Sequence, residues 1–152
     1  MVLTVLKNAL MDNDYVDVKY RELTPTISRI MDLCNSSCGW LQGEDGAQVH
    51  NIDINDILYV EWVDGKCCIC TKDRVYTSAV TLSRLEELLS ENSFVRVSKA
   101  LLVNVYKVRW LSSGLNMKLV AELLNGERVI ISRHYRGDLL DAIHAIVKEK
   151  KK

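Results

Sequence analysis

The chain of 152 residues is predicted to be mostly β (α+β), with small antiparallel sheets and a few short helices. Three dipeptides typical of tight turns each separate two segments rich in β-forming residues: Asp45-Gly46, Asp64-Gly65 and Asn125-Gly126. Asp-Gly and Asn-Gly accept the positive φ angles of the primed turns that join antiparallel strands. With 48% apolar residues, the chain can also bury a real core.

Two of the β-patterned segments have basic residues where a strand runs out into a loop. They are FVRVSKALLVN (94–104) and NGERVIISRHY (125–135). The basic positions at their ends are Arg96, Lys99, Arg133, His134 and Arg136. Rigid strands that present donors at their tips suit a protein that inserts side chains into a nucleic-acid groove. Basic strand ends are also common on solvated edges, so charge alone leaves an ordinary polar rim as the alternative.

Two helices are predicted within and after the strands. In TLSRLEELLSENS (81–93), Thr81 or Ser83 can act as the N-cap. Its apolar positions are expected on one face: Leu82, Leu85, Leu88 and Leu89. A final helix is expected over residues 138–148, and its inward positions are Leu139, Leu140, Ile143 and Ile146.

The first part of the chain is predicted to be a separate strand and helix. YVDVKY (15–20) alternates as a half-buried strand does, and Thr24-Pro25 is a natural helix start. The apolar face of this helix would contain Ile27, Ile30, Met31, Cys34 and Cys38. We expect an N-terminal extension over residues 1–47 and a β domain over residues 48–152. The helical face packs either on that β domain or on a second copy, as a homodimer.

The charge distribution and the cysteines bound the class of protein. The 20 basic and 20 acidic residues cancel, but residues 1–50 carry a net charge of −3 and residues 51–152 a net charge of +3. Net charge therefore neither establishes nor excludes binding to nucleic acid. No apolar run approaches the roughly 20 residues that a membrane span needs, and the start of the chain does not read as a secretory signal. Five irregularly spaced cysteines favour reduced thiols in the cytoplasm.

The sequence contains no familiar catalytic motif. There is no nucleophile elbow, no phosphate-binding glycine loop and no HExxH, so we expect no enzyme and no cofactor. The CCIC string (67–70) resembles metal chemistry, but its spacing lacks the paired elements of a structural zinc site. Small buried hydrophobes are the simpler interpretation of the cysteines, and a metal or redox sensor is the alternative. We expect no metal site.

Four strings in one order are more specific than any one of them. DILYVEWVDGK (56–66) is followed by SRLEELL (83–89), FVRVSKALLVN (94–104) and NGERVIISRHY (125–135). In this register the chain resembles the LytTR-type DNA-binding domain of bacterial transcription regulators, over roughly residues 48–147. Glu61 stands at an acidic position that recurs in this family.

The resemblance implies a fold and a set of contacts. The family fold is mostly antiparallel β, and its loops reach bases in successive major grooves of double-stranded DNA. By position, the loop after the 57–63 strand offers Lys66 and Cys67, and the next hairpin offers Lys99. The ISRHY segment offers Arg133 and His134, with Arg136 beside them. Ser98 stands where the family often has histidine, so this chain departs from the pattern there.

The resemblance also implies how such a protein is used. Fifty residues before the β domain are too few for a phosphoacceptor receiver domain, so a short, receiver-free, cytoplasmic transcription regulator is expected. By analogy, such regulators accompany a small membrane protein, which would be a further partner. A different function class is a β-rich protein-interaction module for an acidic partner. Salt-dependent, sequence-selective binding to duplex DNA separates the two.

Overall fold

The computed structural model describes residues 21–22, 24–27, 39–90 and 93–150. The chain divides into two compact units, residues 1–36 and residues 37–152. In the first unit residues 25–27 are helical, and the backbone N–H of Ile27 donates to Thr24 Oγ1 at 3.3 Å, as expected of the predicted N-cap. The predicted strand 15–20 and the helical positions Ile30, Met31, Cys34 and Cys38 lie outside the described residues.

The described residues of the second unit form β-strands, two α-helices and short 3-10 turns. The strands are β1 (Trp40–Asp45), β2 (Gln48–Asp53), β3 (Ile57–Val63), β4 (Lys66–Thr71), β5 (Val75–Ser78), β6 (Phe94–Ser98), β7 (Leu101–Asn104), β8 (Val108–Ser113), β9 (Leu119–Leu123) and β10 (Arg128–Ile131). The helices are α2 (Leu82–Leu89) and α3 (Arg136–Lys150). The 3-10 turns are η1 (Ile54–Asp56), η3 (Val105–Lys107), η4 (Leu115–Met117) and η5 (Arg133–Tyr135).

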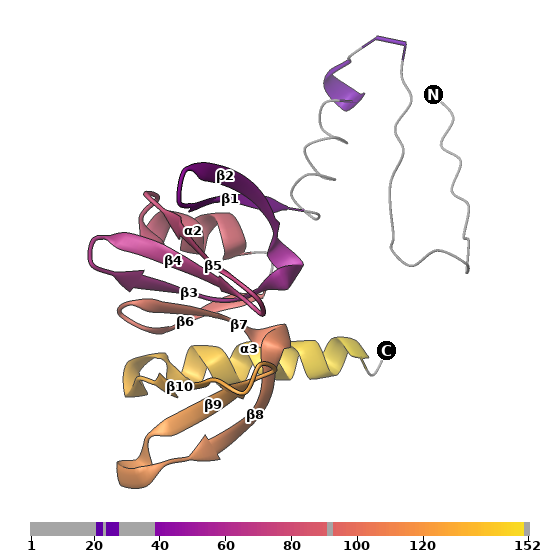
Figure 1. Cartoon of the computed structure of the whole chain (residues 1–152). Helices are drawn as coiled ribbons and strands as arrows, with labels where there is room; N and C mark the ends of the chain where they lie inside the picture. Colours follow the sequence, from indigo (N-terminus) through magenta and orange to yellow (C-terminus); the bar gives the residue numbers. More distant parts are fainter. Residues whose placement is uncertain (1–20, 23, 28–38, 91–92, 151–152) are drawn as a thin grey trace. The chain divides into compact units, whose positions relative to one another are not determined.

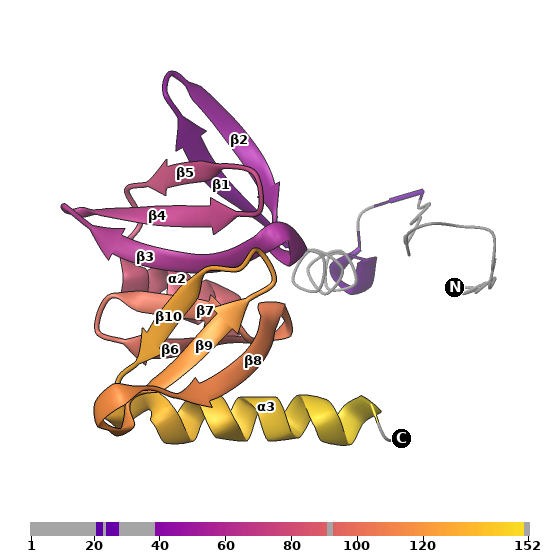
Figure 2. The same cartoon turned by 60° about the horizontal axis from the view of Figure 1, so that its bottom comes forward.

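The strands form two antiparallel sheets, so the predicted fold class is confirmed. The larger sheet has seven strands in the order β2-β1-β5-β4-β3-β7-β6, and the smaller has the order β10-β9-β8. Figures 1 and 2 show α2 against one face of the larger sheet, and α3 lies along β6 where the two sheets meet. The predicted boundary between the N-terminal extension and the β domain, at residues 47 and 48, lies between the two strands of the β1–β2 hairpin. These strands pair from Trp40↔Asp53 to Asp45↔Gln48.

The three predicted turns all join antiparallel strands, but they differ in conformation. In the β3–β4 turn both central residues have positive φ, 48° at Asp64 and 81° at Gly65, as a primed turn requires. In the β9–β10 loop, Gly126 has φ 88° and its N–H donates to the carbonyl of Leu123 at 2.9 Å. Asn125 is absent from the positive-φ positions of the described chain. Gly126 therefore takes the left-handed position after an ordinary turn, and the primed turn predicted there does not form.

Two hydrophobic cores meet at β3 and β7. One core lies between the larger sheet and α2, and it includes Val60, Leu85 and Leu102. The other lies between the sheets and α3, and it includes Val103 and Leu139. Since neighbouring residues of a strand point to opposite faces, β7 contributes to both cores at once.

α2 has a predicted cap, and the predicted inward positions of both helices are buried or packed on a core except Leu88 and Leu140, of which Leu140 is half-buried. Thr81 is the N-cap of α2, and its side chain accepts from the N–H of Arg84 at 3.3 Å. Leu82, Leu85 and Leu89 are buried, whereas Leu88 is 48% exposed. Leu88 was predicted on the buried face, but a helix turns about 100° per residue and this rotation carries it to the flank. In α3, Leu139 is fully buried, as predicted, and Ile143 and Ile146 pack beside it.

Gly43 allows β1 to lie close against β5. A Cβ atom at this position would be 2.7 Å from both Ile52 Cδ1 and Tyr76 Cβ. Gly43→Ala is therefore expected to lower the free energy of unfolding by about 1–3 kcal/mol, as overpacking does. Urea denaturation of the purified protein measures this.

The matched control is Gly137→Ala in α3, where a new Cβ atom meets nothing within 4 Å. Because alanine favours the helix, this change is expected to raise the free energy of unfolding by about 0.5–1 kcal/mol. Equal effects of the two substitutions would contradict the close approach at Gly43.

Candidate nucleic-acid interface

Three segments that are distant in sequence meet along one edge of the β unit. They are the β3–β4 turn, the β6–β7 turn and the junction between β10 and α3, on the left in Figures 1 and 2. The N–H of Trp62 donates to the carbonyl of Ala100 at 2.8 Å, which ties β3 to the β6–β7 turn. The N–H of Ser132 donates to the carbonyl of Val97 at 2.8 Å, which ties the end of β10 to β6. Backbone hydrogen bonds therefore set how these loops lie relative to one another.

The five basic candidates named from the sequence lie on this edge, whereas Cys67, which was also expected to offer a contact, is fully buried in β4. Lys66 begins β4, Lys99 lies in the β6–β7 turn, and both are exposed. Arg133 and His134 belong to η5 and are exposed, while Arg136 begins α3 and is half-buried. The rings of His134 and Tyr135 pack edge to face, with centroids 5.1 Å apart. Within the described part of the chain, no carboxylate forms a salt bridge with any of these five side chains.

Arg96 has a different position from the one predicted for it. Its Nη1 is 2.9 Å from Glu86 Oε2 on α2, and its Nε donates to the carbonyl of Ser98 at 3.2 Å. Its Nη2 donates to the carbonyl of Lys99. The guanidinium therefore closes the β6–β7 turn and joins it to α2, so Arg96 is not a donor at a strand end. A planar group with five N–H donors suits this task better than an ammonium does.

The same edge also contains carboxylates. Glu61 and Glu127 line a hollow of about 480 Å³ between β3, β7 and β10, together with Tyr59 and Ser98. Asp64 precedes Lys66 by two residues in the β3–β4 turn. Arg128 also lines this hollow but lies 3.3 Å from Glu122, so the hollow attracts an anionic ligand less than the loop tips do.

The loop between β8 and β9 belongs to the same edge, although the sequence reasoning assigned it no role. Asn116 and Lys118 line a hollow of about 530 Å³ together with Ser98 and Arg133. The nearest indication in the sequence is Gly114, which with Asn116 interrupts the β-rich run. That pattern indicates a loop, but it does not say which other loops lie beside it.

Two of the three cysteines of β4 are core residues. Cys67 and Cys70 are buried, and Cys68 is half-buried. Burial raises the pKa of the Cys70 thiol to about 11 and also raises the pKa of Cys67. Reactive cysteines have lowered pKa values, so these two are small apolar core residues. Cys34 and Cys38 lie outside the described residues, and no metal-binding group of His, Cys, Asp or Glu occurs among those that are described.

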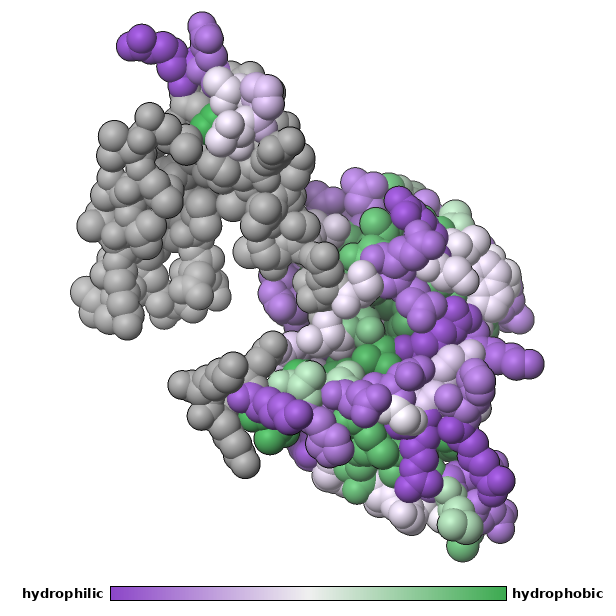
Figure 3. Space-filling view, turned by 180° about the vertical axis from the view of Figure 1, so that it is seen from behind, coloured by the Kyte–Doolittle hydropathy of each residue, from purple (hydrophilic) through white to green (hydrophobic). Residues whose placement is uncertain are grey.

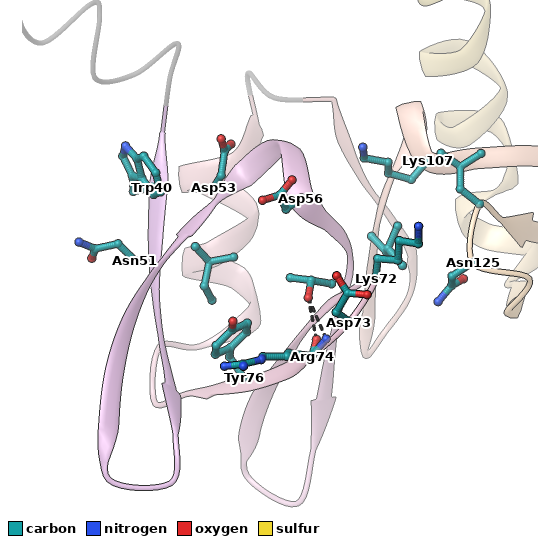
Figure 4. A pocket seen from close by; sticks show the side chains of 14 residues that line it. Trp40, Asn51, Asp53, Asp56, Lys72, Asp73, Arg74, Tyr76, Lys107 and Asn125 are labelled. Atoms are coloured by element: carbon teal, nitrogen blue, oxygen red, sulfur yellow. Dashed lines mark hydrogen bonds between the residues drawn. The ribbon is translucent and has the colours of Figure 1, made fainter. Parts of the chain in front are cut away.

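A further hollow of about 640 Å³ lies at the other end of β4, away from the basic loop tips (Figure 4). Acidic and basic side chains, among them Asp56, Arg74 and Lys107, surround it together with Trp40 and Tyr76. Since side chains of both charges line this hollow, it does not select for either charge of ligand.

None of the helices in the described ranges has the length and apolar character to cross a membrane.

An antiparallel β domain with basic loop ends along one edge is compatible with a class of DNA-binding proteins that use no recognition helix. Residues 47–144 match the LytTr DNA-binding domain, and the chain belongs to this family. The resemblance and the mostly β fold predicted from the sequence are both confirmed.

Individual relatives agree with this assignment. The sensory transduction protein LytT of Bacillus subtilis is 27% identical over 99 residues, covering 65% of this chain and 41% of that protein. LytT of Bacillus cereus is 32% identical over 88 residues, covering 58% of this chain and 36% of that protein. The chain thus spans about two fifths of the length of these curated relatives. A solved LytTr DNA-binding domain from Bacillus cereus has the same fold, with a TM-score of 0.64, 21% identity and coverage of 68% of this chain and 95% of that one.

Replacing Arg96 tests whether its guanidinium orders the β6–β7 turn. Arg96→Ala is expected to lower the free energy of unfolding by about 1–3 kcal/mol, because turn carbonyls and Glu86 lose a charged donor. It is also expected to speed hydrogen exchange at the amide of Trp62, which is bonded to the same turn.

The matched control is Arg84→Ala, which removes an exposed ion pair with Glu87 on the same helix. A change within about 0.5 kcal/mol is expected there. If both variants have the stability and the Trp62 exchange rate of the parent protein, Arg96 does not order the turn.

Proposed function

We propose that this chain is a sequence-specific, double-stranded DNA-binding transcription regulator of bacteria, and that it acts in the cytoplasm without enzymatic activity. The observation that carries the proposal is the meeting of three basic loops on one edge, in a domain of the LytTr DNA-binding family. Each loop is tied to its neighbour through backbone hydrogen bonds. The side chains therefore start from a fixed frame and need little ordering when they bind.

The five candidate residues divide into two roles. Arg133 and His134 belong to η5. The Ser132–Val97 hydrogen bond holds one end of this turn and the start of α3 holds the other, so the turn presents both side chains rigidly to base edges. Arginine pairs bidentately with guanine O6 and N7, and histidine donates to the same acceptors. Lys66 and Lys99 lie on hairpin turns farther along the edge, where a flexible ammonium suits phosphate. Arg136 is half-buried, and we assign it to the phosphate next to the bases that Arg133 reads.

Selection from a random duplex pool, followed by substitution of one residue of each kind, tests these roles. Arg133→Ala is expected to reduce discrimination at particular base pairs by about 1–3 kcal/mol. Lys66→Ala is expected to weaken binding evenly across sequences and to reduce the salt slope by about 1. Fluorescence anisotropy with selected and scrambled duplexes at several salt concentrations measures both effects.

Arg74→Ala and Lys72→Ala are matched controls, because both residues are exposed and lie at the other end of β4. They are expected to bind DNA as the parent protein does. If no duplex from the pool is preferred to bulk DNA, sequence-specific binding is excluded. An acidic protein that binds through Lys66 and Arg133 would then identify an interaction module.

We also propose that the N-terminal segment forms a homodimer. Its apolar helical spacing needs a partner, since an isolated helix of this length is marginally stable in water. A dimer would place two DNA-binding domains on a repeated site and raise affinity through effective concentration.

A small membrane protein is proposed as a further partner, by analogy with short regulators of this type. Binding to it would appear as recruitment of the full chain to vesicles that contain the membrane protein.

Light scattering beside DNA titration tests the dimer. Ile30→Asp is expected to convert a dimer into a monomer and to weaken binding to a repeated site, because it introduces a charge into the apolar stripe. Thr26→Asp is the matched control, as Thr26 is helical and exposed. A parent protein that is monomeric at micromolar concentration, with the same affinity as the chain lacking residues 1–38, would exclude the dimer.

A further inference from the structure

The loop from Gly114 to Lys118 projects two large apolar side chains from the end of the β8–β9 hairpin. Leu115 is 91% exposed and Met117 is 75% exposed. The hairpin end forms the lowest point on the right of Figure 3, where hydrophobic side chains lie below a hydrophilic rim. The N–H of Gly114 donates to the carbonyl of Lys118 at 2.6 Å, which closes the loop at its base.

The loop contains one residue in an unfavourable backbone conformation. Asn116 and Met117 both have φ 60°, a region that asparagine tolerates but methionine rarely occupies. Such strain is concentrated at functional sites. Neither the exposed apolar side chains nor the unfavourable backbone stabilises the isolated domain. Their combination at one hairpin tip indicates that the loop is shaped for contact with something else.

The position of the loop identifies its partner. Asn116 and Lys118 share a hollow with Ser98 and Arg133, so the tip continues the edge that we assign to DNA. The exposed ammonium of Lys118 complements phosphate. Two projecting side chains are far too small for a stable protein interface, which buries about 1,200–2,000 Å² in total. Apolar groups of this size fit a deoxyribose or the methyl group of thymine.

We propose that this loop is a further DNA contact, which binds the duplex beside the base pairs that Arg133 reads. Lys118 binds a backbone phosphate, and Leu115 and Met117 pack against a sugar or a thymine methyl group. The proposal rests on the function proposed above and extends the bound site on the side of β8 and β9. We therefore expect the bound protein to protect a longer stretch of DNA than the basic loop tips alone would cover.

Trimmed duplexes give the direct test. The parent protein is expected to lose affinity about tenfold when base pairs under the loop are removed from one end of the selected site. The double variant Leu115→Ala/Met117→Ala is expected to bind the long duplex about tenfold more weakly and to respond little to trimming. Lys118→Ala is expected to lower the slope of log affinity against log salt by about 0.9, the loss of one phosphate contact.

The matched controls are Val49→Ala, an apolar residue 64% exposed on β2, and Lys72→Ala on the β4–β5 turn. Both are expected to behave as the parent protein does in each assay. Hydroxyl-radical footprinting of the parent protein gives a readout that needs no variant, with extra protection expected on one flank.

The possible outcomes separate this inference from the proposed function. If the parent protein prefers no duplex, both fail. If it binds a selected site, but the variants match it in affinity, salt slope and trimming response, the loop is not a DNA contact and the proposed function stands. A variant that changes self-association and leaves DNA binding unaltered would assign the loop to a protein surface and overturn the inference.

Discussion

The β7 strand is buried on both faces, and the arrangement of the β unit depends on this constraint. Leu102 enters the core beneath α2, while its neighbour Val103 enters the core beneath the smaller sheet, and both are fully buried. A shift of one residue would exchange the two sets of side chains and expose neither to water. Because the side chains that fill one core do not fit the other, both cores fix the register of β7 against β3 and β6. The loop tips at the ends of these strands are thereby held at definite positions.

Two polar side chains fix the β6–β7 hairpin at its opposite ends. At the end of β7, the buried amide of Asn104 donates through Nδ2 to the carbonyl of Ile57 at 2.9 Å and accepts from the N–H of Tyr106 at 3.1 Å. At the turn, the guanidinium of Arg96 binds backbone carbonyls and Glu86. The Asn104 bond to Ile57 is buried and costly to break, and several partly buried bonds from one guanidinium hold the turn, so both ends of the hairpin are held in place.

Sequence reasoning succeeds where the physical cause is local. The Asp64-Gly65 turn and the Thr81 cap depend on adjacent residues, and both are present as predicted. Arg96 shows the limit, because its role depends on Glu86, ten residues earlier on another element. Likewise, the place of the β8–β9 loop beside Arg133 follows from how two sheets pack, and no spacing within the loop encodes that. Fold class and helices are therefore predictable here, while sheet order and the full extent of the edge require the structure.

The two outer strands of the larger sheet differ in their openness to edge-to-edge association. The edge of β6 is interrupted by a register shift between Arg96 and Ser98, and the N–H of Ser132 already occupies the carbonyl of Val97. By contrast, among the described strands β2 pairs only with β1, and it has the exposed Val49 near its start. An unpaired strand edge is a template for another strand. Strand exchange and aggregation of the β unit would therefore begin at β2, away from the basic loops, so that DNA bound to the opposite part of the domain would not block them.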